Sequence, residues 1–239
     1  MTASDSISVS ARPEAMSLDP RHAAVIVVDM QNGFAKPGGF LERRGMDISG
    51  APAVIANCSR VIATARQRGM RIIHLQMGWH PQMYEMGAPR GGNWHKSMAW
   101  RFMRDRPENA GTAITRGTWD YAIIDELAPQ PGDIVIPKTK QSGFFDTNLD
   151  SVLRNLGIRT LAFVGIATNV CVEATLRDAS YRDYLCLLVA DATDATGPDY
   201  VKQATMFNVE MILGWVTTTD EFVAALDAST IAESSSDIK

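Results

Sequence analysis

The chain has 239 residues, of which 46% are hydrophobic and 21% charged, a composition typical of a globular protein and not of a disordered or fibrous one. Its formal net charge is −4 and it contains no dense run of lysine and arginine, so it lacks the positive charge that nucleic-acid binding requires. The longest uncharged runs reach about a dozen residues, too few for a membrane-spanning helix.

The N-terminal residues and the cysteines indicate the cellular compartment in which the protein resides. Residues 1–20 lack a basic start followed by an apolar stretch, and we interpret them as a loose N-terminal arm, not as a secretory signal. Cys58, Cys171 and Cys186 are too few and too scattered for a disulfide framework or a paired metal motif. An odd number of free thiols fits a reducing compartment, so we expect a cytoplasmic protein.

Strands and helices are predicted to alternate along the chain. Residues 23–29 are a continuous apolar run that ends in an acid, which is typical of a buried parallel strand. From residue 52 to 69 apolar residues recur at helical spacing, which places Cys58 in the core. Residues 70–76 predict a second strand. The segment 78–120 is rich in glycine and aromatic residues without a clear period, and we expect a functional or mobile loop that can close over a site.

The same alternation continues to the end of the chain and predicts an α/β fold. The fold is expected to be a three-layer α/β/α arrangement with a central parallel sheet of roughly six strands. It would form one domain over residues 21–228, followed by a disordered tail, 229–239. The further predicted strands are 133–138, 159–165, 185–191 and 209–215, and the further helices are 146–156, 169–184, 198–208 and one that begins with a Thr218–Glu221 capping box and runs through Leu226.

Three residues with useful chemistry lie where predicted strands end, the edge at which parallel sheets bind ligands. Cys171 is near the start of a predicted helix, where the helix dipole favours a thiolate, although a buried structural cysteine fits the same position. Lys138 fits either a site or a solvated loop, and Asp29 either a site or a capping acid. Together they suggest a nucleophile, a base for its proton, and an ammonium group that lowers the thiol pKa.

Other catalytic arrangements lack their residues. The chain has four histidines and none follows His95, which excludes a Cys-His or Ser-His-Asp triad with a C-terminal histidine. The motifs G-x-S-x-G, G-x-G-x-x-G and G-x-x-x-x-G-K-[ST] are absent. The hydrolase-elbow, dinucleotide-binding and P-loop classes therefore have no local support.

The segments VIVVDMQNGF, VIPKTKQSGF and VGIATNVCVEATLRDA resemble the three signature segments of the isochorismatase-like cysteine hydrolases. The resemblance covers about residues 11–226. It implies a catalytic triad of Asp29, Lys138 and Cys171, a cis peptide between Ile166 and Ala167, and an oxyanion hole formed by the amides of Ala167 and Cys171.

Two branches of this family can be compared with the sequence. Nicotinamidases have a metal site built on D-W-H-P and a second histidine, whereas this chain has Gly78 before Trp79 and His80 and lacks the second histidine. We therefore expect no metal and no cofactor, with His80 at the surface or the pocket rim. Isochorismatases that cleave an ether lack the cysteine, so by resemblance Cys171 indicates hydrolysis of a C–N bond.

Seven further fragments (ARPEA, GWHPQMYE, NWHKS, GTWDY, PQPGDIV, SGFF and GIATNVCVE) resemble the ureidoacrylate amidohydrolases of pyrimidine degradation. This resemblance implies cleavage of a small ureido substrate through a cysteine thioester. It also implies a homo-oligomer. Met77 and Gln141 replace the Asn and Tyr expected in this group, so contacts to the substrate are expected to differ. The residues that the resemblance places at the substrate are Trp79, Glu85, Asn93, Ser97 and Gln141, the first four of which fit core or loop positions equally well.

Two alternatives remain open from the sequence alone. A related hydrolase would act on biuret, an N-carbamoyl amino acid or a hydrazide. A doubly wound module that binds a small molecule without chemistry would use the same strand ends.

Overall fold

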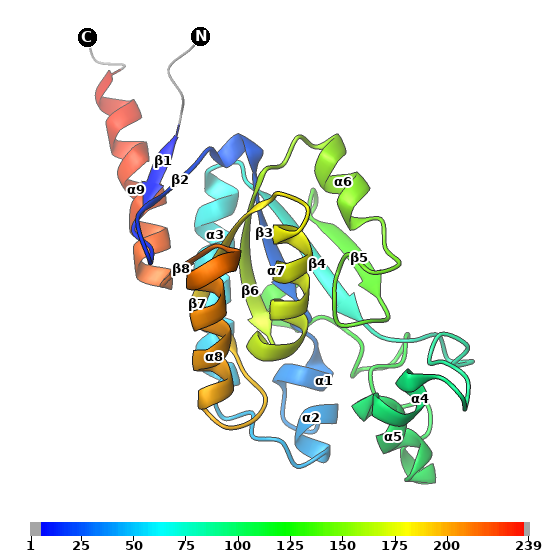
Figure 1. Ribbon diagram of the computed structural model, residues 1–239. Coiled ribbons are helices and arrows are strands. Elements are labelled where there is room, and N and C mark those ends of the chain that lie inside the picture. Colours follow the sequence, from blue (N-terminus) through cyan, green and yellow to red (C-terminus); the bar gives the residue numbers. More distant parts are fainter. Residues whose placement is uncertain (1–5, 237–239) are drawn as a thin grey trace.

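A six-stranded parallel sheet forms the centre of the computed structural model, which describes residues 6–236 and the side chains of residues 6–228. The strand order is β5-β4-β3-β6-β7-β8, and every neighbouring pair is parallel. The expected parallel sheet is therefore confirmed (Figure 1). The strands are β3 (Ala23–Val28), β4 (Arg71–Met77), β5 (Ile134–Lys138), β6 (Thr160–Ile166), β7 (Leu185–Asp194) and β8 (Trp215–Thr217).

Helices cover both faces of the sheet, which confirms the three-layer prediction (Figure 1). Every residue of β3 is buried, because alternate side chains enter different cores. Val25 and Val27 pack with one layer, and Ile26 and Val28 with the other. The first layer holds α3 (Ala51–Gln67) and α9 (Thr219–Ser236), and the second holds α6 (Leu149–Asn155), α7 (Glu173–Ser180) and α8 (Tyr200–Asn208).

Helix α3 forms as its sequence predicts. Proline occupies its first turn, where a missing N–H costs nothing, and Gly69 follows its end with a φ of 72°. Cys58 lies fully buried on its inner face and donates to the Ala192 carbonyl oxygen at 3.3 Å. Cys58 is thus the core residue that was expected.

The N-terminal segment is not a loose arm in its described part. Strands β1 (Ile7–Val9) and β2 (Met16–Leu18) pair antiparallel and bury their alternate apolar side chains. Arg12 also exchanges backbone hydrogen bonds with Val216, at 2.8 and 3.0 Å, beside the main sheet. The segment is ordered because period-two apolar residues cover α9 (Figure 1). Residues 1–5 lie outside the described part.

Near the C-terminus the structure corrects two predictions. Residues 209–213 form a π-helical turn after α8, and only Trp215 of the predicted strand 209–215 belongs to β8. Val209 and Leu213 are buried four residues apart while the residues between them point outwards, which is a helical period. The predicted capping box is confirmed, since Glu221 N donates to Thr218 Oγ1 at 3.3 Å. Helix α9 then runs to Ser236, where a disordered tail was expected, and residues 237–239 lie outside the described part.

The short α-helices lie beyond the carboxyl ends of the strands (Figure 1). The long segment 78–120, expected to be an irregular loop, contains two short helices and a 3₁₀ turn. Within the described residues no helix is both long and apolar enough to cross a membrane. The short helices are α1 (Asn32–Ala35), α2 (Phe40–Arg43), α4 (Gly92–Lys96) and α5 (Met98–Arg104), and the 3₁₀ turns are η1 (Pro20–His22), η2 (Pro107–Asn109) and η3 (Asp125–Leu127).

Candidate active site

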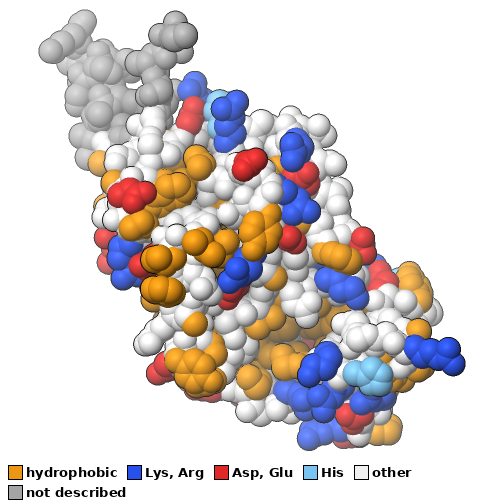
Figure 2. All heavy atoms as spheres, in the orientation of Figure 1, with side chains coloured by type: hydrophobic (Ala, Val, Ile, Leu, Met, Phe, Trp, Pro, Cys, Tyr) orange, Lys and Arg blue, Asp and Glu red, His pale blue; other side chains and the backbone are white. Residues whose placement is uncertain are grey.

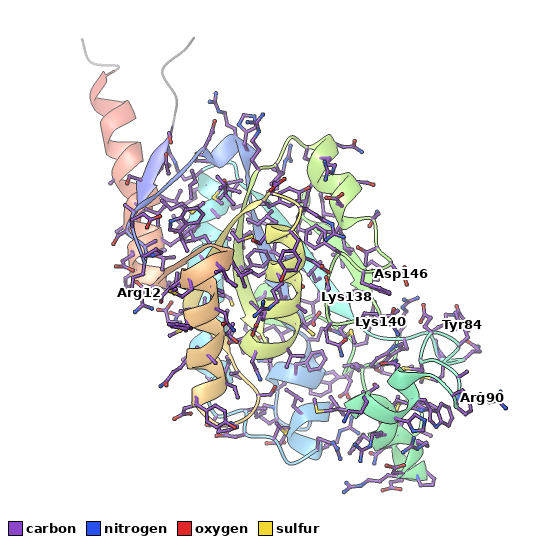
Figure 3. All side chains as sticks on the ribbon, in the orientation of Figure 1. Arg12, Tyr84, Arg90, Lys138, Lys140 and Asp146 are labelled. Carbon is purple, nitrogen blue, oxygen red and sulfur yellow. The ribbon has the colours of Figure 1, made fainter. Side chains whose placement is uncertain are left out.

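Three strand ends bring the predicted triad together. Asp29 follows β3, Lys138 ends β5, and Cys171 lies in the turn after β6, the neighbour of β3. Figure 3 places Lys138 and Lys140 at the carboxyl end of β5. Parallel strands present their carboxyl ends at one edge, so residues more than one hundred positions apart in the chain meet there.

Lys138 and Asp29 form a buried ion pair. The distance from Lys138 Nζ to Asp29 Oδ2 is 2.7 Å, and their side chains are 0% and 1% exposed. The ammonium also donates to the carbonyl oxygen of Lys140 at 3.1 Å and contacts Met77 Sδ at 3.5 Å. Burial lowers the pKa of Lys138, but the negative groups beside it outweigh burial and the pKa is raised. Lys138 therefore stays protonated.

The Cys171 thiol lies close enough to both members of this pair for each to act on its pKa, and it lines the same cavity as Asp29. Burial raises its pKa to about 12; Asp29 adds to the increase and Lys138 opposes it. The ammonium of Lys138 lowers the thiol pKa, as expected, but desolvation exceeds its attraction and the net pKa is raised. The sulfur rests as a thiol.

Asp29 is the group able to take the thiol proton. Burial raises its pKa, although Lys138 acts against burial. A carboxylate of raised pKa is a stronger base than an exposed one. Its backbone is also constrained, with a φ of 51° and an amide that donates to the Leu75 carbonyl oxygen at 3.1 Å. The carboxylate is thereby fixed at the sheet edge.

The turn that carries Cys171 differs from the helix that was predicted to begin at Asn169. A cis peptide joins Ile166 and Ala167, as the resemblance implies, and a π-helical turn (η4, Thr168–Val172) comes before α7. The amides of Val170 and Val172 both donate to the Ala167 carbonyl oxygen, at 3.0 and 3.1 Å. Thr175 Oγ1 donates to the carbonyl oxygen of Cys171 at 2.6 Å. These bonds hold the cysteine backbone from both sides.

A small cavity of about 50 Å³ opens beside the sulfur. Its wall is mostly apolar, and besides Asp29 and Cys171 only Thr196 is polar. Asn169 fixes the Thr196 backbone through two hydrogen bonds, at 3.0 and 3.1 Å. Most of this wall could not be identified from sequence, because isolated apolar residues look like core residues. The wall consists of Asp29, Phe34, Leu41, Met98, Ile166, Ala167, Val170, Cys171 and Thr196.

The five predicted substrate residues are not on this wall. Trp79 is buried at 2% exposure, and Gln141 is exposed. Glu85 accepts a hydrogen bond from the His80 amide at 2.7 Å and pairs with Arg116 at 3.1 Å. In this structure Glu85 organises the backbone of the segment 78–120.

Asn93 and Ser97 have comparable roles. Asn93 Nδ2 donates to the Met86 carbonyl oxygen at 2.7 Å, and Ser97 caps α5 by accepting from the Trp100 amide at 3.3 Å. All of these residues except Gln141 belong to the segment that lies over the strand ends. Their contact with substrate stays a prediction.

Gln31 is a site residue that the sequence reasoning missed. It is fully buried, accepts from the Met77 amide, and donates to the carbonyl oxygens of Met77 and Tyr121, each at 2.8 Å. It thereby joins the ends of β3 and β4 to Tyr121, the residue after the segment 78–120. The available signal was a polar residue two positions after Asp29, in the turn that follows a fully apolar strand.

No group of three or more metal-ligating side chains occurs among the residues that the structure describes. His80, the residue compared with the nicotinamidase metal site, is half-buried and stacks its ring against Tyr84 at a centroid distance of 4.9 Å.

The family model described as an isochorismatase domain matches residues 23–221. The ureidoacrylate amidohydrolase RutB of Agrobacterium fabrum is 52% identical over 92% of this chain and 96% of its own length. The ureidoacrylate amidohydrolase RutB of Enterobacter sp. is 49% identical over 94% of this chain and 98% of its own length.

Solved structures agree with these matches. A cysteine hydrolase from Pseudomonas syringae has a TM-score of 0.74 and 29% identity, covering 89% of this chain and 95% of its own. An N-carbamoylsarcosine amidase from Thermoplasma acidophilum has a TM-score of 0.62 and 28% identity, and the match covers 83% of this chain and 96% of the amidase.

Proposed function

The chain belongs to the isochorismatase family, and we infer that it is a ureidoacrylate amidohydrolase. The identity of about half of all positions over more than nine-tenths of the chain supports this substrate. The observation that carries the chemistry is the buried Asp29–Lys138 ion pair close to the Cys171 thiol, beside a cavity that Asp29 and Cys171 both line. The resemblance of the sequence to the same group extends the proposal to pyrimidine degradation.

The first step forms the nucleophile. Asp29 accepts the proton of Cys171 as the sulfur attacks the ureido carbonyl carbon, so the high thiol pKa never requires a free thiolate. Lys138 remains an ammonium and balances the negative charge as it moves from the carboxylate to the substrate.

The attack produces a tetrahedral oxyanion. The amides of Ala167 and Cys171 are proposed to donate to it. The cavity wall includes both residues, and the two hydrogen bonds that the Ala167 carbonyl oxygen accepts fix the turn that carries their amides. Donors fixed in this way need no reorganisation during the reaction.

Collapse of the oxyanion breaks the C–N bond. Asp29, now protonated, gives its proton to the departing nitrogen, and aminoacrylate leaves while the carbamoyl group stays on Cys171 as a thioester. A water molecule that Asp29 deprotonates then attacks the thioester carbon, releasing carbamate and restoring the thiol. One carboxylate thus serves both half-reactions.

The segment 78–120 is proposed to act as a lid, because Met98 of α5 forms part of the cavity wall. We also propose a cytoplasmic homo-oligomer. Hydrophobic side chains exposed around α8, among them Met211 and Ile212 at 62% and 73% exposure, support self-association (Figure 2). Light scattering of the purified protein tests the oligomeric state.

A substrate panel tests the function. The purified enzyme is offered ureidoacrylate, biuret, N-carbamoylsarcosine and a hydrazide, and products are resolved by mass. We expect ureidoacrylate to be hydrolysed with the highest kcat/KM. Preference for N-carbamoylsarcosine, the second candidate that the solved amidase structure favours, would overturn the substrate assignment. No turnover of any member would instead favour a binding module.

A further inference from the structure

Basic side chains gather over the segment that closes the site. The chain carries a net charge of −4, yet residues 90–106 contain five basic residues and one acidic residue. Figure 2 shows Lys and Arg side chains clustered at the lower right, the place of α4 and α5 in Figure 1. Arg90 lies at the outer edge of this region (Figure 3). The positive charge therefore lies on the same side of the molecule as the cavity.

Helices α2 and α5 connect the charge to the cavity. Leu41 of α2 and Met98 of α5 both form its wall. Arg44 follows Leu41 by three residues, and Arg101 follows Met98 by three. Residues three apart on a helix lie on the same face, so each arginine is one turn from the cavity wall.

Arg101 and Arg104 of α5 and Arg44, which directly follows α2, all act on one acid, Asp105. Arg104 Nε donates to Asp105 at 2.8 Å, and Arg101 and Arg44 add to the attraction that keeps the pKa of Asp105 below its usual range. We call Arg44, Arg101 and Arg104 the basic rim. One carboxylate leaves this rim with an excess of positive charge, which would favour an additional anion.

The basic rim contrasts with its neighbour Arg43, whose guanidinium pairs with Asp120 at 2.6 Å. Over the described part of the chain, neither Arg44 nor Arg101 has a side-chain hydrogen bond or ion pair. Inside the site the ammonium of Lys138 is already committed, since it holds Asp29 and the Lys140 carbonyl oxygen. An anionic substrate would thus find its free cations at the rim.

We propose that the basic rim recruits the carboxylate of an anionic ureido substrate to the mouth of the cavity. The inference rests on the proposed function, because ureidoacrylate combines the ureido group that Cys171 attacks with a carboxylate at its other end. The rim acts on capture of the substrate and leaves the bond-breaking steps to the triad.

Steady-state kinetics test this role with ureidoacrylate and its uncharged methyl ester. The variants are Arg44→Gln, Arg101→Gln and the double variant, with Arg71→Gln as control. Arg71 is an exposed arginine at the amino end of β4, the sheet edge opposite the site. At low salt we expect kcat/KM for ureidoacrylate to fall about threefold in each single variant and about tenfold in the double variant, through KM.

Added salt and the uncharged ester distinguish an electrostatic role of the basic rim from a structural one. Added salt is expected to lower the wild-type kcat/KM for ureidoacrylate and to remove most of the difference between wild type and double variant. The preference for acid over ester should shrink in the double variant and stay unchanged in Arg71→Gln. Equal KM values for ureidoacrylate in all variants, or an equal loss with acid and ester, would overturn the role of the rim. Failure of the wild type to hydrolyse ureidoacrylate would overturn the proposed function itself.

Discussion

The two ends of strand β5 carry buried ionic clusters that differ in what surrounds them. At the carboxyl end, Lys138 pairs with Asp29 next to a thiol and a cavity. At the amino end, Asp133 accepts from Arg66 at 2.6 Å and from the Gln130 amide at 2.8 Å. Burial of charge is common to both, so burial alone does not identify a site.

The difference lies in the partners of each carboxylate. Arginine stays protonated and holds Asp133 in a fixed structural bond. His74, 3.6 Å from Asp133, is 2% exposed, and burial lowers its pKa. Asp29 instead faces a group that can lose a proton. A buried carboxylate becomes a candidate base where a nucleophile and space for a substrate accompany it.

Removing the nucleophile should give the largest effect. We expect Cys171→Ala to lower kcat at least about 10⁴-fold, because no other group can form the thioester. Cys186→Ala is the matched control, since Cys186 is also buried but has no charged partner among the described residues. That variant should lose about 1–2 kcal/mol of stability and keep its activity. Turnover in Cys171→Ala above one-hundredth of wild type would contradict the assignment.

Removing the base should come next. Asp29→Asn leaves a carbonyl and an amide that cannot accept the thiol proton, and we expect kcat to fall about 10³-fold. The buried Lys138 also loses its counter-charge, which is expected to cost about 3–5 kcal/mol of unfolding free energy. Rates and urea denaturation measure the two effects. A stable variant with wild-type kcat would show that another base acts.

The pH profile should show an acid limb. Activity needs Asp29 ionised, and its raised pKa places the loss of activity at a pH above that for an exposed aspartate, whose pKa is 3.8. On the alkaline side, Lys138 has a raised pKa and that of Cys171 is about 12, so kcat/KM should stay flat up to about pH 10. Stopped assays across this range measure the profile. A bell-shaped curve centred near neutrality would indicate a thiolate paired with a different acid.

Disruption of the Asp133–Arg66 cluster, at the amino end of β5, should have the smallest effect on catalysis. Asp133→Asn removes the charge that faces Arg66 and is expected to lower the unfolding free energy by about 3 kcal/mol. We expect kcat to stay within about twofold of wild type, because the cluster lies at the far end of β5. Denaturation and a rate measurement on one preparation compare the two. A large fall in kcat without loss of stability would contradict the conclusion that the Asp133 cluster is structural and takes no part in catalysis.

The strand ends could be predicted from sequence because local patterns determine them. An apolar run that ends in Asp29 and a turn that contains Cys171 each point to the same sheet edge. The cavity wall could not, since Phe34, Leu41 and Met98 come from short helices without a distinctive pattern. The effect of Lys138 on the thiol pKa could be predicted, but the larger opposing effect of burial could not, because the extent of burial depends on packing from the whole chain.

The most direct measurement of the central claim is peptide mass spectrometry on enzyme quenched with acid during turnover of ureidoacrylate. The proposed mechanism predicts a carbamoyl group on the peptide that contains Cys171 and none on the Cys58 or Cys186 peptides. A carbamoyl adduct on a different residue, formed and consumed at the rate of turnover, would contradict it.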